Sequence, residues 1–414
     1  MNQPRPIVIL IAYYFPPSFE IGARRPARFY KWLQRMGYRC HIVTATPQGD
    51  DCPADVSFVR DDTYELWEKG TGKKSLQFYY ELLIRQLMFP GHLGIAWSRK
   101  AADEVARIAD ANPGERFVLF TTYPPVGTLL AGLAIHKRLK IPWIADFRDP
   151  FHALITKGAP RFSTYMTRRF EGHVFRKASA IIANMEPAAE MWRERYPWSR
   201  EKLHVIYNGF DPEEEQGSVP IPPRDHKQIA HAGTFYDNRN IDTLVKSLGR
   251  LRARGESVAI SSRFFLLGVS EGEYALDWEL YRAAMRDGRV ELHPRVSWKE
   301  ADRIMAEADG LLMAGYPFNT VQVPAKLYSY ICIGRPILAL LLRSSQVETI
   351  LQNAAVPSVC VYYDDPPEVV DRKLLEYLRL PNIPMPTNEW FRTNFNAQNQ
   401  TEALAAIIDS VSRR

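Results

Sequence analysis

Glycine and basic residues with the spacing of an anion site occur in the second half of the 414-residue sequence. The run 231–234, His-Ala-Gly-Thr, ends an apolar stretch, and Arg239 lies just before a helical pattern. Lys326 follows Pro324 at the start of another helical pattern. A glycine such as Gly233 lets a ligand approach the backbone closely, and helix N-termini favour bound negative charge. These residues could therefore stabilise a diphosphate, or they could be a turn glycine with two solvated cations.

A basic stripe marks the helical pattern at 23–36 in the first half. Its members recur at the i, i+4, i+7 and i+11 positions of one helix face: Arg24, Arg28, Lys31 and Arg35. The stripe is either a solvated helix face or a docking surface for an anion.

Three charged residues, Asp146, Arg148 and Asp149, cluster at the end of a later apolar run. Ligands of open α/β sheets bind beside the carboxyl ends of the strands. The cluster could therefore serve an acceptor site, or it could be a salt-bridge network that braces the loop.

Several common active-site motifs are absent from the sequence. There is no G-x-G-x-x-G for a dinucleotide, no D-x-D for a metal-bridged diphosphate, no H-E-x-x-H and no G-x-S-x-G. The run GTGKKS at 70–75 lacks the first glycine of a P-loop. The four cysteines form no C-x-x-C pair and no metal-like spacing. We therefore expect no metal and no cofactor.

Short β-like runs alternate with helical patterns along both halves of the chain, which is typical of βαβ units and parallel sheets. The segment 211–226 is rich in acids and prolines and is the best linker candidate. We predict an α/β protein with two Rossmann-like domains at 1–210 and 211–394. The sequence leaves open whether the helical tail at 395–414 packs back on the first domain.

Charge is distributed unevenly along the chain, whose net charge is +6. Residues 1–210 carry 30 Lys and Arg against 20 Asp and Glu, a surplus of +10, whereas residues 211–414 carry 23 against 27. A basic domain suggests an anionic partner. The stretches 78–89 and 161–177 mix aromatics with arginine, so they are either membrane-surface helices or ordinary helices with aromatics in the core.

The sequence resembles bacterial glycosyltransferases of the GT-B fold, in the large glycosyltransferase family four. The likeness follows the family's order over most of the chain, in the runs 7–44, 121–125, 141–151, 169–186, 205–211, 229–240, 290–313 and 323–340. The resemblance implies two Rossmann-like domains facing across a cleft. It also implies sugar transfer from a nucleotide diphosphate sugar to an acceptor, with retained anomeric configuration and without a metal.

The resemblance assigns roles to particular residues. Those expected to act in catalysis are Arg239, Lys326, Asp146, Arg148 and Asp149. Those expected to bind the donor are Gly233, Thr234, Arg295, Val296, Pro324 and Ser329. Those expected to bind the acceptor are Gly22, Arg24, Arg25 and Asn208.

One departure from the family concerns the donor ribose. Relatives commonly carry a pair of glutamates where this chain has Val321 and Ser329. A serine is a neutral, shorter hydrogen-bonding group than a glutamate. The substitution leaves open a non-catalytic homologue that binds a saccharide. A nucleotide-sugar epimerase, another class of enzyme with the same fold, is a second alternative.

The basic first domain suits a lipid-linked saccharide acceptor at an anionic membrane surface, as in surface polysaccharide assembly. No run approaches the roughly 20 apolar residues of a spanning helix. We therefore expect a cytoplasmic protein bound peripherally to the inner membrane. Nucleic acid is not expected as a partner because no recognised reading motif is present, and the oligomeric state is open.

Overall fold

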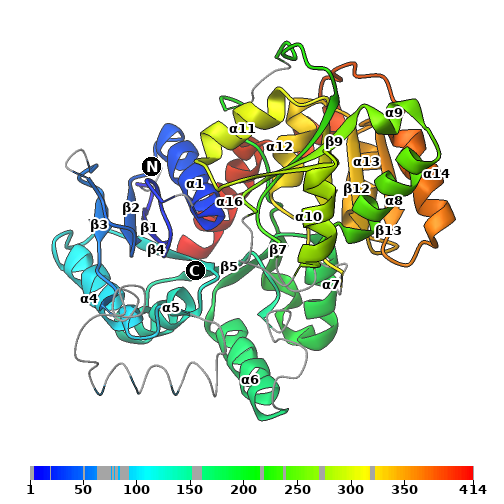
Figure 1. Cartoon of the computed structure of the whole chain (residues 1–414). Helices are drawn as coiled ribbons and strands as arrows, with labels where there is room; N and C mark the ends of the chain where they lie inside the picture. Colours follow the sequence, from blue (N-terminus) through cyan, green and yellow to red (C-terminus); the bar gives the residue numbers. More distant parts are fainter. Residues whose placement is uncertain are drawn as a thin grey trace. The chain divides into compact units, whose positions relative to one another are not determined.

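The computed structural model describes most of the chain (Figure 1). The described residues are 4–18, 20–49, 52–62, 76, 79, 83, 93–151, 161–214, 219–235, 239–269, 276–317 and 322–413. They form two compact units, Met1–Asn208 with Ala397–Arg414, and Gly209–Asn396. The run at 70–75, most of the stretch 78–89, and Val321 lie outside the described residues.

Unit 1, the unit that holds the N-terminus, contains a seven-stranded parallel sheet of order β3-β2-β1-β4-β5-β6-β7. Its strands are β1 (Ile7–Ile11), β2 (Cys40–Thr44), β3 (Val56–Phe58), β4 (Phe117–Tyr123), β5 (Trp143–Phe147), β6 (Ala180–Ala183) and β7 (Leu203–Val205). Its helices are α1 (Arg24–Arg35), α4 (Trp97–Asp110), α5 (Val126–Leu139), α6 (Arg161–Lys177), α7 (Glu186–Arg195) and α16 (Ala397–Ser412), with short 3-10 turns at Ile21–Ala23 and Pro197–Lys202. Strands β1, β5 and β6 are buried along their whole length, as expected when helices cover both faces of a parallel sheet.

The C-terminal helix α16 belongs to unit 1. Leu404 and Ile408 are fully buried in the same hydrophobic core as Leu10 of β1. The hydroxyl of Tyr38, which follows α1, donates a hydrogen bond of 2.8 Å to Asp409 Oδ1. The chain therefore returns to the first unit after it has completed the second.

Unit 2 contains a six-stranded parallel sheet of order β10-β9-β8-β11-β12-β13. Its strands are β8 (Lys227–Ala232), β9 (Ser262–Leu267), β10 (Val290–His293), β11 (Gly310–Ala314), β12 (Ile337–Leu341) and β13 (Ser358–Tyr362). Its helices are α8 (Asp242–Ala253), α9 (Ser257–Ile260), α10 (Trp278–Arg286), α11 (Trp298–Ala306), α12 (Lys326–Ile333), α13 (Gln346–Asn353), α14 (Pro367–Leu378) and α15 (Glu389–Phe395). The prediction of two parallel α/β sheets is confirmed.

Each sheet has one point where the strand order reverses direction. In unit 1 this point lies between β1 and β4, and in unit 2 between β8 and β11. Loops leave the two strands toward opposite sides there, so the carboxyl ends open a crevice that ligands of this architecture occupy. The fold therefore indicates one candidate site in each unit.

A close backbone approach at the start of α5 limits which residue can occupy position 127. A Cβ on Gly127 would lie 2.2 Å from the carbonyl oxygen of Gly94. We expect Gly127→Ala to lower the free energy of unfolding by about 1–3 kcal/mol, because the backbone must shift to admit the methyl group. Gly49→Ala is the control, since a Cβ there meets nothing within 4 Å. Urea denaturation of the two variants should separate them, and equal stabilities would contradict the packing argument.

Candidate functional site

In unit 2, β8 and β11 separate before β8 ends. Their pairing stops at Ala230 and Leu311, whereas β8 stays paired with β9 through Ala232. Beyond that point, two side chains of α12, one helical turn apart, form hydrogen bonds with the backbone of Ala232. The Ala232 N–H donates to the Tyr330 hydroxyl at 2.9 Å, and Lys326 Nζ donates to the Ala232 carbonyl at 2.5 Å. The helix is therefore docked at the tip of β8 by Lys326 and Tyr330.

Backbone carbonyls on the β11 side of this fork are also satisfied by side chains. His231 Nδ1 lies 2.9 Å from the carbonyl oxygen of Leu312, and Arg239 Nε donates to that of Ala314 at 2.8 Å. Both basic side chains are almost completely buried. Buried polar backbone groups need partners, so the fork itself fixes where these two side chains lie.

Gly233 leaves room for the lysine at the fork. Its φ of +129° belongs to the region that favours glycine, and a Cβ there would lie 2.5 Å from Lys326 Nζ. The Gly233 N–H donates to the carbonyl of Leu267 at 2.8 Å, so it is used inside the sheet. This amide is therefore already hydrogen-bonded, and the glycine contributes space beside Lys326.

Burial and neighbouring positive charge lower the pKa values of His231 and Lys326. The pKa of His231 lies well below its ordinary value because of burial and because of the charges on Lys326 and Arg239. The pKa of Lys326 also lies well below its ordinary value, through burial and through Arg239. Among the described residues, no carboxylate contributes to either shift. Buried cations are stabilised by a paired anion, so this cluster is suited to bind one.

The other expected donor residues lie around the cluster or elsewhere in unit 2. Ser329 is half-buried on α12, three residues after Lys326, and Pro324 is buried and accepts a hydrogen bond from the Leu327 N–H at 3.0 Å. Thr234 is half-buried directly after Gly233. Two further residues, the exposed Arg295 and the half-buried Val296, lie between β10 and α11.

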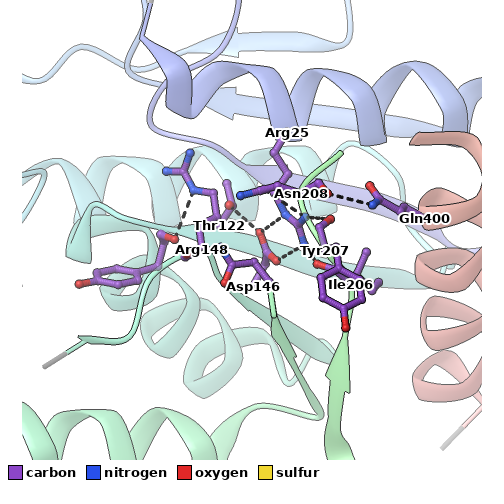
Figure 2. Close-up of polar contacts among 10 residues, drawn as sticks. Arg25, Thr122, Asp146, Arg148, Ile206, Tyr207, Asn208 and Gln400 are labelled. Atoms are coloured by element: carbon purple, nitrogen blue, oxygen red, sulfur yellow. Dashed lines mark hydrogen bonds and ion pairs between the residues drawn. The ribbon is translucent and has the colours of Figure 1, made fainter. Parts of the chain in front are cut away.

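In unit 1, a buried ion pair joins α1 to the end of β5 (Figure 2). Arg25 donates to both carboxylate oxygens of Asp146, from Nε at 3.1 Å and from Nη2 at 2.8 Å. Thr122 donates a third hydrogen bond to Asp146, of 2.8 Å. Bidentate pairing fixes the planes of the guanidinium and the carboxylate relative to each other, so Arg25 cannot turn toward a ligand without breaking the pair.

The same arginine holds the segment that follows β7. Its guanidinium donates to the carbonyls of Ile206 at 2.8 Å and Tyr207 at 2.6 Å, and lies 3.4 Å from Asn208 Oδ1. From α16, Gln400 donates to the Asn208 carbonyl at 3.2 Å (Figure 2). Arg25 and Gln400 therefore fix the backbone where unit 1 ends.

Arg148 braces two loops of unit 1 through their carbonyl groups. It donates to the carbonyl oxygens of Gly22 at 2.8 Å and Tyr123 at 3.3 Å, and also to that of Pro124. Burial lowers the pKa of Arg148. A Cβ on Gly22 would lie 2.7 Å from Arg148 Nη1, so a side chain at position 22 would displace the arginine.

The structure thus brings together two groups of the residues expected from sequence. Gly22, Arg25, Asp146, Arg148 and Asn208 form one network, and Gly233, Arg239 and Lys326 form another. Arg24 and Asp149 are half-buried beside the first group in sequence.

Sequence reasoning missed two residues of the second group, His231 and Tyr330. The available signals were a histidine directly before the Ala-Gly pair and a tyrosine four residues after Lys326, on the same helix face.

The described residues contain neither a candidate metal site nor a candidate membrane-spanning helix. No group of three or more His, Cys, Asp or Glu in that part of the chain could hold a metal ion. None of the helices in the described ranges is both long and apolar enough to cross a bilayer.

The buried ion pair of unit 1 can be tested by Asp146→Asn. The change leaves the Arg25 guanidinium without its counter-charge, so we expect a loss of about 3–5 kcal/mol in the free energy of unfolding. Asp103→Asn removes the exposed partner of Arg138, and we expect a loss below about 1 kcal/mol. Denaturation curves of both variants measure the difference. A similar small loss in both would show that Arg25 does not depend on Asp146.

Comparisons with known proteins identify a family and structural relatives. Residues 23–214 match the model of the family described as Glycosyltransferase Family 4. No curated protein sequence matches the chain. The sucrose-phosphate synthase of Thermosynechococcus elongatus is similar in structure, with a TM-score of 0.62 and 14% identity, over 98% of this chain and 99% of that one.

Two other solved structures are similar over nearly their whole length. Anabaena HepE, solved with UDP-glucose, has a TM-score of 0.54 and 14% identity, over 99% of this chain and 98% of its own. A Listeria monocytogenes protein described as a UDP-N-acetylglucosamine 2-epimerase has a TM-score of 0.58 and 10% identity, over 98% and 96%. The chain therefore has the GT-B fold and resembles the glycosyltransferases of family 4.

Proposed function

We propose that the protein transfers a sugar from a nucleoside diphosphate sugar, bound by unit 2, to a saccharide acceptor bound by unit 1. The observation that carries the proposal is the basic cluster of His231, Arg239 and Lys326 at the β8–β11 fork, in which no described carboxylate contributes to the lowered pKa values of His231 and Lys326. A leaving diphosphate gains negative charge as the glycosidic bond breaks, and fixed cations stabilise that charge.

The proposed mechanism uses protein cations in place of a metal. Lys326 and Arg239 oppose the charge on the leaving diphosphate, and Gly233 keeps the space that the lysine and the phosphate share. Thr234, Ser329, Pro324, Arg295 and Val296 complete the donor site. The resemblance to family 4 supports retention of the anomeric configuration. HepE was solved with UDP-glucose, which supports a nucleoside diphosphate sugar as the donor.

On the acceptor side, we assign two kinds of role. Gly22, Arg24, Asp149 and Asn208 contact the acceptor. Arg25, Asp146 and Arg148 hold the loops that carry these residues, since their charged groups bond to one another or to loop carbonyls. The catalytic contribution of Asp146 and Arg148 is then one of positioning.

An aromatic and basic surface on α6 supports a lipid-linked acceptor at an anionic membrane. Phe162 and Tyr165 are 59% and 55% exposed, and Arg169 lies over the Tyr165 ring at 5.6 Å. In the 3-10 turn at Pro197–Lys202, Trp198 is 48% exposed, and Arg176 of α6 lies over its ring at 5.3 Å. Aromatic rings beside arginines suit the interface of an anionic bilayer. The surface therefore supports our proposal of a role in surface polysaccharide assembly, at the cytoplasmic face.

Two alternatives are favoured by specific observations. The structural similarity to a protein described as an epimerase is compatible with release of a product without an acceptor. Ser329, where relatives commonly carry a glutamate, is compatible with a saccharide-binding protein that does not turn over a donor. Nucleotide release with and without a saccharide acceptor distinguishes all three.

Lys326 and Ser329 should affect different kinetic constants. We expect Lys326→Ala to lower turnover by about 10² or more, because the lysine meets charge that develops only as the diphosphate leaves. We expect Ser329→Ala to weaken donor binding by about 0.5–1.5 kcal/mol, the contribution of a neutral hydrogen bond. Steady-state kinetics with EDTA present, on the donor found by a thermal-shift screen of nucleotide sugars, measures both.

The matched control is Lys299→Ala, which removes an exposed lysine from the neighbouring helix α11. It should keep the parent kinetics. Full turnover in Lys326→Ala would refute the assignment of the donor site, and loss of the parent activity in EDTA would refute the metal-free mechanism.

Membrane binding should depend on the α6 surface. We expect the double variant Phe162→Ala, Tyr165→Ala to cosediment about tenfold or more weakly with phosphatidylglycerol vesicles, because two apolar rings no longer insert. Binding of the parent protein should also weaken as salt rises, since exposed charges are screened within about 10 Å at 0.1 M. Ile383→Ala, which alters an exposed residue of unit 2, is the control. Binding that is indifferent to salt and to the double variant would refute the membrane surface.

A further inference from the structure

The hydrogen bonds of His231 determine which of its ring nitrogens carries a proton. Nδ1 lies 2.9 Å from the Leu312 carbonyl oxygen, which can only accept, so Nδ1 is the donor. Backbone hydrogen bonds of the ring to Leu312 and Gly233 raise its pKa, but burial and the charges of Lys326 and Arg239 lower it further, so the imidazole is neutral. With Nδ1 protonated, the other nitrogen of the neutral ring, Nε2, is an acceptor. Nε2 lies 3.3 Å from Lys326 Nζ, so the ring accepts a hydrogen bond from the lysine.

The lysine is held between this ring and the tip of β8. Nζ donates to the Ala232 carbonyl at 2.5 Å and to His231 Nε2 at 3.3 Å. An ammonium group has three hydrogens. Among the contacts of the described residues these two use two of them, and Nζ lies 2.5 Å from the position that a Cβ of Gly233 would take. The third hydrogen is left for a ligand that approaches beside the glycine.

We propose that His231 is a positioning residue that fixes Lys326 Nζ for a diphosphate by accepting its hydrogen bond, and that diphosphate binding draws a proton from solution onto this pair. The proposal rests on the proposed function, because it takes the ligand to be the diphosphate of a nucleotide sugar. It extends that function by coupling donor binding to proton uptake.

The groups around the pair determine the direction of the coupling. Burial and the charge of Arg239 lower the pKa of Lys326, and the phenols of Tyr330 on α12 and Tyr363 after β13 are also within reach of Arg239. Asp302 of α11 acts on the phenol of Tyr330. A bound diphosphate raises the pKa of Lys326 again, because an anion stabilises the ammonium form. At a pH below the lowered pKa, Lys326 is already charged, so nucleotide binding takes up few protons. At a pH above it, binding takes up nearly one proton per nucleotide.

The tautomer of His231 can be tested without any ligand. In the full chain with ¹⁵N-labelled histidine, long-range ¹H–¹⁵N correlation spectra assign the protonated ring nitrogen, and His231→Asn identifies the signal. We expect a neutral ring with Nδ1 protonated and Nε2 unprotonated, persisting below the ordinary histidine pKa of about 6.5. A proton on Nε2, or titration near 6.5, would overturn the proposal.

Calorimetry with uridine diphosphate then tests the coupling in two buffers of different ionisation enthalpy. The variant His231→Asn keeps an N–H for the Leu312 carbonyl but loses the acceptor for Lys326, whereas His231→Gln can present an oxygen to the lysine. We expect about tenfold or more weaker binding in His231→Asn, substantial recovery in His231→Gln, and proton uptake by the parent protein that increases with pH. Uridine, which lacks phosphate, should bind all three alike.

The outcomes distinguish the positioning role of His231 from the proposed function. If His231→Asn binds uridine diphosphate as tightly as the parent, or if it weakens uridine equally, His231 does not position Lys326 and the proposal is overturned. If the parent protein binds no nucleoside diphosphate, with adenosine and guanosine diphosphate tried as well, the proposed function fails. The tautomer of His231 in the ligand-free protein still decides whether the ring holds the lysine.

Discussion

The separation of two parallel strands, β8 and β11, is the constraint on which the site of unit 2 depends. Pairing stops at Ala230 and Leu311, and the backbone groups beyond that point take side-chain partners instead. Because several of these partners are basic, the fork collects positive charge in a buried place, where unpaired charge is costly. A bound anion relieves that cost. The conformation of Gly233 and the docking of α12 follow from the same geometry, since the lysine needs the space and the helix supplies it.

Unit 1 also reverses its strand order, between β1 and β4, but these strands stay paired along the whole of β1 and the charge balance nearby is different. There the buried arginine of α1 faces the carboxylate of Asp146, and the pair is completed by Thr122 and by backbone carbonyls. A cation that is already paired has little need of an anionic ligand. The two related architectures therefore suit different tasks. The basic side chains of unit 2 suit an anionic ligand, whereas the charged side chains of unit 1 hold its loops in place. This division agrees with a donor site in one unit and an acceptor site in the other.

The sequence predicted the architecture and part of the site. Alternating apolar runs and helical patterns identified two parallel sheets, because strands covered on both faces are apolar along their length. Gly233, Arg239 and Lys326 could be selected because a glycine and cations beside helix starts can form an anion site, and because the resemblance to the family indicated the same residues. The role of Arg25 could not be predicted from the sequence. Arg25 lies next to the basic stripe and resembles a solvent-exposed cation, and its partner Asp146 is 121 residues away along the chain. His231 and Tyr330 were missed for the opposite reason: a histidine and a tyrosine in apolar runs look like core residues. Their roles depend on where β8 leaves β11, which is a tertiary feature.

A crystal structure with bound uridine diphosphate would test the central claim most directly, namely that the basic cluster of unit 2 binds a diphosphate. The account predicts a phosphate oxygen within hydrogen-bond distance, about 2.7–3.2 Å, of Lys326 Nζ, beside Gly233. It would be contradicted by a nucleotide whose diphosphate lies elsewhere in the protein while Lys326 keeps its contacts with Ala232 and His231 and touches no phosphate.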